Sequence, residues 1–157
     1  MIHRQRLTAR LDGKFVVFLI GLRINEPLRI RQWWPVVNAM PRMLQELRRQ
    51  PDLGFIHAEN WFARTLIMVQ YWRSMEHLLA YAKAKDAAHL PAWRDFNRLV
   101  AATGSVGIWH EAYEVVPGGY ENIYVNMPAF GLGKVGELVE AGPGLQSAAA
   151  RLRASLN

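Results

Sequence analysis

The run Phe15–Leu22 constrains the fold more than any other segment of the chain. It reads FVVFLIGL, so both of its alternating faces are apolar, which is typical of a strand that is covered on both sides. Basic residues precede the run as they do in a signal peptide, but Arg23 follows at once and no small-residue cleavage site is present. The run is also far shorter than the ~20 residues that span a bilayer. We therefore expect a buried strand over 14–24, and no membrane partner.

Periodic apolar positions predict the other elements around this strand. Helical spacing is found over 32–50, 75–85 and 87–102, with a short helix in 145–155, and strand patterns over 54–61, 64–72, 105–116 and 120–127. Pro41 is expected to kink or restart the first helix, and Ser74 to cap the second. The predicted order is β-α-β-β-α-α-β-β, followed by a tail. When one extra helix and one extra strand are set aside, the core order is β-α-β-β-α-β. This order predicts an α+β fold with a ferredoxin-like antiparallel sheet and helices on one face.

One face of such a sheet is bare, although these strands are apolar on both faces. An identical subunit is the simplest cover, so we expect a homodimer. Six Trp, five Tyr and six Phe in 157 residues also favour an interface, a lined pocket, or both.

Length and composition predict one globular domain. We expect a polar lead-in over 1–13, the domain over 14–140 and a tail with a short helix over 141–157. The absence of cysteine excludes disulfides, thiolate metal sites and cysteine nucleophiles, and a cytoplasmic location is the default. The first 50 residues carry a net charge of +7, which we interpret as a solvated arginine-rich surface. A nucleic-acid partner is not favoured because no recognition motif accompanies the charge.

Chemically useful side chains gather on the last two predicted strands. His110 lies on an otherwise largely apolar face, and Tyr124 and Asn126 form a polar ladder on the next strand. A histidine there could move a proton, and the ladder could hold a substrate oxygen. A structural histidine is an equally good interpretation of His110 and of His89. The tryptophans are more often core or interface than pocket, and Glu111 is more often solvated or paired.

Standard catalytic signatures are absent. The sequence Gly131-Leu132-Gly133-Lys134 lacks the spacing of a phosphate loop. His110 and Glu111 are adjacent on a strand and point to opposite faces, so they do not form a zincin pair. We therefore predict no metal site.

Several stretches resemble a known family. These are RQWWPVVNAMPRML, YWRSMEHLLAYAKAKDAAHLPAWRDFN, VGIWHEAYEV and YENIYVNMPAFGLG. Over about 14–140 the chain is similar to the fumagillin-pathway-type monooxygenase-like family of the dimeric α/β-barrel superfamily. The resemblance implies a ferredoxin-like subunit that pairs into a dimeric barrel. It carries over positions rather than roles, because fold and family do not fix the chemistry.

The leading hypothesis is a monooxygenase-like oxidoreductase for a small hydrophobic substrate, with O2 as co-substrate and no cofactor. Its candidate catalytic residues are His110, His89 and Glu111, and its candidate substrate-binding residues are Trp93, Asn97, Trp109, Tyr113, Tyr124 and Asn126. One alternative is a haem-binding enzyme, either haem-degrading or aldoxime-dehydratase-like, with a histidine iron ligand. Another is a non-catalytic dimeric module that binds a small molecule.

Overall fold

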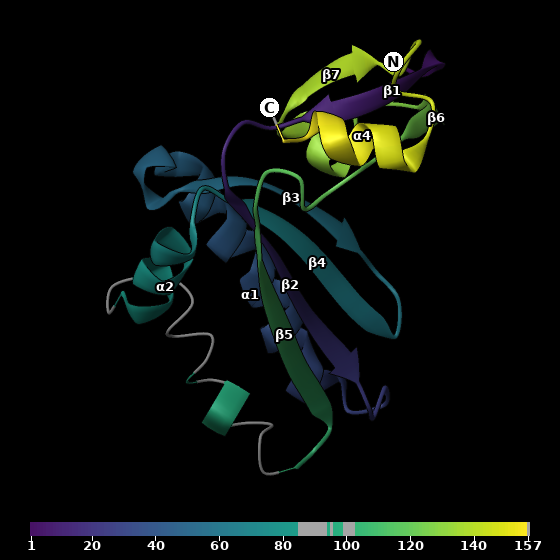
Figure 1. Ribbon diagram of the computed structural model, residues 1–157. Helices are drawn as coiled ribbons and strands as arrows, with labels where there is room; N and C mark the ends of the chain where they lie inside the picture. The colour runs from purple at the N-terminus through teal and green to yellow at the C-terminus, as the bar shows by residue number, and fades with distance from the viewer. Residues whose placement is uncertain (85–93, 95, 99–102, 157) are drawn as a thin grey trace.

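Two antiparallel sheets organise the chain in the computed structural model, which describes residues 1–84, 94, 96–98 and 103–156 (Figure 1). The larger sheet has the strand order β3-β4-β2-β5, and the smaller has the order β6-β1-β7. The strands are β1 (His3–Arg10), β2 (Phe15–Ile24), β3 (Phe55–Trp61), β4 (Thr65–Trp72), β5 (Val106–Val115), β6 (Tyr124–Met127) and β7 (Glu137–Glu140). The helices are α1 (Ile30–Arg49), α2 (Met75–Lys83) and α4 (Ala148–Ala154), with 3-10 turns η1 (Pro51–Leu53) and η3 (Gly131–Lys134).

The four-stranded sheet has one face covered by helices. The other, called the open face below, is uncovered except at the end that packs against η3 and the smaller sheet. Along β4 the residues Leu66, Met68, Gln70 and Trp72 are buried and alternate with half-buried neighbours. α1 lies across the buried side (Figure 1), where Leu44 and Leu47 join the main core. This arrangement confirms the predicted ferredoxin-like α+β fold with helices on one face of an antiparallel sheet.

Trp72 is the centre of the main core. Its side chain is only 1% exposed, and its ring lies edge-on to Phe55 and tilted against Tyr81, with centroids 5.6 and 5.7 Å away. The indole Nε1 donates a hydrogen bond of 2.8 Å to Oε1 of Gln70. A buried polar ring nitrogen therefore has its partner inside the core, as buried donors require.

The predicted helices and strands over 32–85 are confirmed. Ser74 caps α2, since its hydroxyl accepts from the backbone N–H of His77. α1 continues through Pro35 and Pro41 as one helix, so the expected restart at Pro41 does not occur. The predicted helix over 87–102 lies outside the described residues, apart from 94 and 96–98. No helix in the described ranges combines the length and apolar character needed to cross a membrane.

The smaller sheet differs from the sequence-based expectation. The segment interpreted as a polar lead-in contains β1, the central strand of this sheet, which pairs with both β6 and β7. Only Leu7, Thr8 and Ala9 of β1 are buried, too few to give a clear apolar pattern. The division into 1–13, 14–140 and 141–157 stays a prediction.

The position of β6 corrects a second expectation. We expected strand 120–127 to lie beside strand 105–116, but β6 spans only Tyr124–Met127 and pairs with β1 in the other sheet. Strand β5 pairs only with β2, so it is an edge strand of the described sheet. The chain leaves the larger sheet at the turn after Val115, where Gly118 has a φ of 77°.

Candidate functional site

A hollow of about 280 Å³ lies between α1 and the β3–β4 hairpin, on the helix-covered face of the larger sheet. Its described lining consists of Trp34, Val37, Asn38, Met40, Pro41, Leu44, Arg48, Asn60, Trp61, Phe62, Leu66, Ile67 and Met68. Along α1 the lining runs from Trp34 to Arg48, about 21 Å at the rise of an α-helix. The hollow is therefore elongated and mostly apolar.

Three of these lining residues are polar, namely Asn38, Arg48 and Asn60. Two amides and one guanidinium can donate hydrogen bonds to an oxygen that gains negative charge. A largely apolar pocket with a few placed polar groups is the usual form of a small-molecule site. None of the described lining residues is His, Asp, Glu or Tyr, so the hollow contains no side chain suited to be a general base near neutral pH.

His110 lies on the same face of the sheet but at the opposite edge. Its ring centroid is 5.7 Å from that of Phe18, and its side chain is exposed. The strand register places Asn60, Met68, Ile20 and His110 in one row across the sheet. His110 is therefore two strands, or about 10 Å, from Met68 at the edge of the hollow.

The other candidates on β5 point to the open face. The indole of Trp109 lies over Gly21, where a side chain would not fit, because a Cβ there would clash with Nε1 of the indole. Tyr113 donates a hydrogen bond of 2.6 Å to Oε2 of Glu111. This bond to a carboxylate raises the pKa of Tyr113 above its ordinary value.

The remaining candidates occupy other places. Tyr124 is half-buried beside η3, where its hydroxyl accepts from the backbone N–H of Gly133 at 2.9 Å, and burial raises its pKa. Asn126 is exposed on β6 with a φ of 54°, in the left-handed region that asparagine tolerates. Asn97 is exposed. His89 and Trp93 lie outside the described residues. Of the described candidates, Trp109, Glu111 and Tyr113 share the open face of β5, and a hydrogen bond joins Tyr113 to Glu111.

A polar cluster on the open face was missed by the sequence reasoning. The carboxylate of Glu59 accepts from Nζ of Lys134 at 2.8 Å and from the backbone N–H of Gly131 at 3.2 Å, and it lies 3.1 Å from Nε2 of His57. Burial raises the pKa of Glu59, but these partners outweigh that effect and leave it below its ordinary value of 4.5. The period of two on β3, which puts His57, Glu59 and Trp61 on one face, was the available signal.

This cluster joins η3 to the larger sheet. The backbone N–H groups of Gly131 and Gly133 already bond Glu59 and Tyr124. The glycine-rich turn that superficially resembles a phosphate loop is thus filled by the protein's own side chains.

Replacing Glu59 by Gln is expected to lower the free energy of unfolding by about 1–3 kcal/mol at pH 7. Because the folded-state pKa is depressed, this contribution is present above about pH 4.5 and is lost as the pH falls through the folded-state pKa. Urea unfolding at pH 7 and pH 3 checks the effect, with Glu137→Gln on exposed β7 as control. If the free energy of unfolding depended on pH equally in Glu59→Gln and in the native chain, this prediction would be contradicted.

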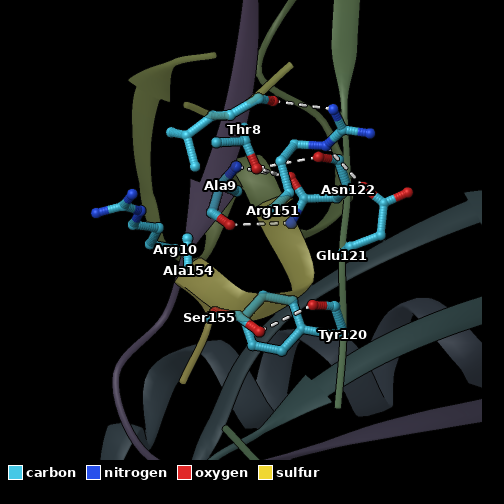
Figure 2. A pocket seen from close by; sticks show the side chains of 10 residues that line it. Thr8, Ala9, Arg10, Tyr120, Glu121, Asn122, Arg151, Ala154 and Ser155 are labelled. Atoms are coloured by element: carbon cyan, nitrogen blue, oxygen red, sulfur yellow. Dashed lines mark hydrogen bonds and ion pairs between the residues drawn. The ribbon is translucent and has the colours of Figure 1, made fainter. Parts of the chain in front are cut away.

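A second, much smaller recess lies between β1 and α4 (Figure 2). Its volume of about 10 Å³ is roughly that of one water molecule. Figure 2 shows that hydrogen-bonded side chains fill it. Nε of Arg151 donates to Oε2 of Glu121 at 2.7 Å. The side-chain amide of Asn122 accepts from the backbone N–H of Ala9 and donates to the carbonyl of the same residue. These contacts hold α4 and β1 together and leave no room for a ligand.

Comparison with known proteins identifies the family. A family model described as monooxygenase af470-like matches residues 15–132. The chain belongs to this family. The resemblance inferred from the sequence motifs is therefore confirmed.

The monooxygenase af470 of Aspergillus fumigatus is 30% identical to this member of the family, over an alignment that covers 95% of this chain and 66% of that protein. The chain thus spans just under two thirds of the length of that relative. An aldoxime dehydratase, OxdRE, solved with butyraldoxime, is 15% identical with a TM-score of 0.63 and covers 90% of this chain and 39% of its own. This likeness supports the fold. The cofactor-independent oxygenase SnoaB from Streptomyces nogalater is 13% identical with a TM-score of 0.47, covering 64% of this chain and 92% of its own.

The residues of this family member do not fit the haem alternative in the part of the chain that is described. That alternative needs a histidine iron ligand beside an apolar cavity, and no described residue lining the hollow is a histidine. Nor do the described residues include a group of three or more His, Cys, Asp or Glu placed to hold a metal ion.

Proposed function

We propose that this chain is a monooxygenase-type oxidoreductase that oxidises a small hydrophobic substrate bound in the hollow between α1 and the β3–β4 hairpin. The observation that carries the proposal is the lining of this hollow, which combines apolar side chains with Asn38, Arg48 and Asn60. Membership of the monooxygenase af470-like family supports the reaction type.

The proposed reaction needs no resident cofactor, because the substrate itself supplies the electrons. A methylene made acidic by its neighbours loses a proton, and the resulting carbanion or enolate reduces O2. One oxygen atom becomes a carbonyl on that carbon. The second oxygen leaves as water with the two hydrogens of the methylene, so four electrons pass from carbon to O2.

The polar groups of the hollow have separate proposed roles. The amides of Asn38 and Asn60 hold the oxygen on which the enolate charge is concentrated. The guanidinium of Arg48 balances this charge from the rim of the hollow, where its side chain is exposed. The apolar lining orients the substrate and excludes water.

The proton acceptor is proposed from the sequence. His110 and His89 are the proposed bases and Glu111 the third predicted catalytic residue. Trp93, Asn97, Trp109, Tyr113, Tyr124 and Asn126 stay predicted binding residues. A base must lie within hydrogen-bond reach of the proton, directly or through one water. His110 therefore acts only on a substrate that extends under α1 towards β5.

Oxygen uptake with a panel of enolisable and phenolic compounds tests the proposal. We expect uptake by the native chain, and a loss of about 10²–10⁴-fold in His110→Ala or His89→Ala, the usual contribution of a general base. Unchanged rates in both variants would contradict the histidine base while leaving the hollow as the substrate site. No uptake by the native chain with any compound would count against the oxygenase itself.

We also propose that the chain is a homodimer, with the open sheet face covered by a second copy. The strand register pairs Leu19 with Val69 on this face, and both are only half-buried in one subunit. Sedimentation velocity that finds only monomer at micromolar concentration would contradict this. The cytoplasmic location stays a prediction.

A further inference from the structure

One end of the molecule exposes several large apolar side chains. Its members, called the aromatic tip below, are Leu28, Ile30, Trp34, Trp61 and Phe62. Leu28 is 96% exposed and Phe62 is 78% exposed, so both project from the surface. Large apolar patches on a monomer usually mark an interaction site.

Two connections and one helix end bring the aromatic tip together. The backbone N–H of Ile24 donates to the carbonyl of Arg64 at 3.0 Å, which joins the end of β2 to the β3–β4 turn. Nε1 of Trp33 donates to the carbonyl of Pro27 at 2.9 Å and fixes the β2–α1 connection against the start of α1. In Figure 1 both connections lie at the lower right, at one end of the four-stranded sheet.

The charge around the aromatic tip is strongly positive. Segments 23–34 and 60–65 contain four arginines, Arg23, Arg29, Arg31 and Arg64, and a single acid, Glu26. Glu26 is already paired with Arg29 at 2.6 Å. The tip therefore presents an excess of guanidinium groups to any partner that approaches it.

We propose that the aromatic tip docks on an anionic lipid bilayer. Its apolar side chains project from a turn and a helix end, a shape that penetrates an interface better than it matches the broad contact of a standard protein complex. Tryptophan is favoured at the headgroup level, and arginines near the surface are attracted to acidic lipids.

The sequence led us to expect no membrane partner, because its apolar run is too short to span a bilayer. Docking on the bilayer surface needs no spanning segment, so that argument does not apply to it. The same residues connect the tip to the hollow, because Trp34, Trp61 and Phe62 belong to both. A hydrophobic substrate dissolved in the bilayer would reach the hollow without crossing water. This last step rests on the proposed function, whereas the docking itself does not.

Co-sedimentation with lipid vesicles tests the docking without any substrate. We expect the native chain to pellet with phosphatidylcholine vesicles that contain about 30 mol % phosphatidylserine, and less with phosphatidylcholine alone. The double variant Leu28→Ser/Ile30→Ser should bind at least about tenfold more weakly, since it removes apolar area that the bilayer would bury. Arg31→Glu should weaken binding about fivefold or more on the anionic vesicles.

The control is Leu79→Ser/Val125→Ser, which changes two exposed apolar residues on α2 and β6 and should bind as the native chain does. Equal loss in the control and the tip variant would overturn the proposal, as would a native chain that stays in the supernatant. A tip variant that changes the sedimentation coefficient without lipid would show instead that the tip joins two copies of the chain. Circular dichroism establishes that each variant is folded.

Discussion

Asn60→Ala is expected to lower kcat for substrate oxidation by about 10²–10³-fold, the usual effect of removing one donor from an oxyanion site. Asn60 lines the hollow from the second-to-last position of β3, next to Trp61. Its side chain is exposed, so the free energy of unfolding should change by less than about 0.5 kcal/mol. Steady-state oxygen uptake and urea unfolding measure the two effects separately.

Asn126→Gly is the matched comparison for this prediction. Asn126 is also an exposed asparagine, and glycine tolerates its positive φ. It belongs to the site predicted from the sequence but does not line the hollow. A large loss in Asn126→Gly with a normal rate in Asn60→Ala would place the chemistry at β6 and contradict the hollow as the substrate site.

Trp72→Ala is expected to lower the free energy of unfolding by about 3–5 kcal/mol, because it leaves a cavity in the main core. It also leaves Oε1 of Gln70 without its donor in the buried core. Since a domain of this size is stabilised by only about 5–15 kcal/mol, much of the variant should unfold in mild denaturant.

Trp72→Phe separates packing from hydrogen bonding. Phenylalanine keeps most of the contact with Phe55 and Tyr81 but cannot donate to Gln70, so a smaller loss of about 1–3 kcal/mol is expected. Equal losses in the two variants, measured by chemical denaturation, would show that packing against this ring is not what stabilises the core.

The elements of the larger sheet could be predicted because each carries a strong apolar period. β2 is apolar on both faces, β4 alternates and α1 repeats at helical spacing. β1 escaped prediction because arginines occupy most of its exposed positions and only three residues are buried. β7 has four residues, two of them glutamates at its ends, which is too short for a period to appear.

The candidate site was harder to predict because it depends on which strands are neighbours. The sequence-based pocket assumed that consecutive strands pair, whereas β5 ends in one sheet and β6 begins in the other. The hollow escaped notice because its lining residues on α1, such as Val37 and Leu44, follow the same period as core residues. Glu59 was missed because two of its partners, Gly131 and Lys134, lie more than 70 residues later in the chain.

Incorporation of isotopic oxygen shows whether O2 is the source of the new oxygen atom. The chain, purified without added flavin, haem or metal and treated with a chelator, is incubated with an enolisable hydrophobic substrate under ¹⁸O2. We expect a ketone product that carries one ¹⁸O atom, with the second recovered as labelled water, and loss of both signals in Asn60→Ala. A product whose new oxygen comes from the solvent, or labelling that requires an added cofactor, would contradict it.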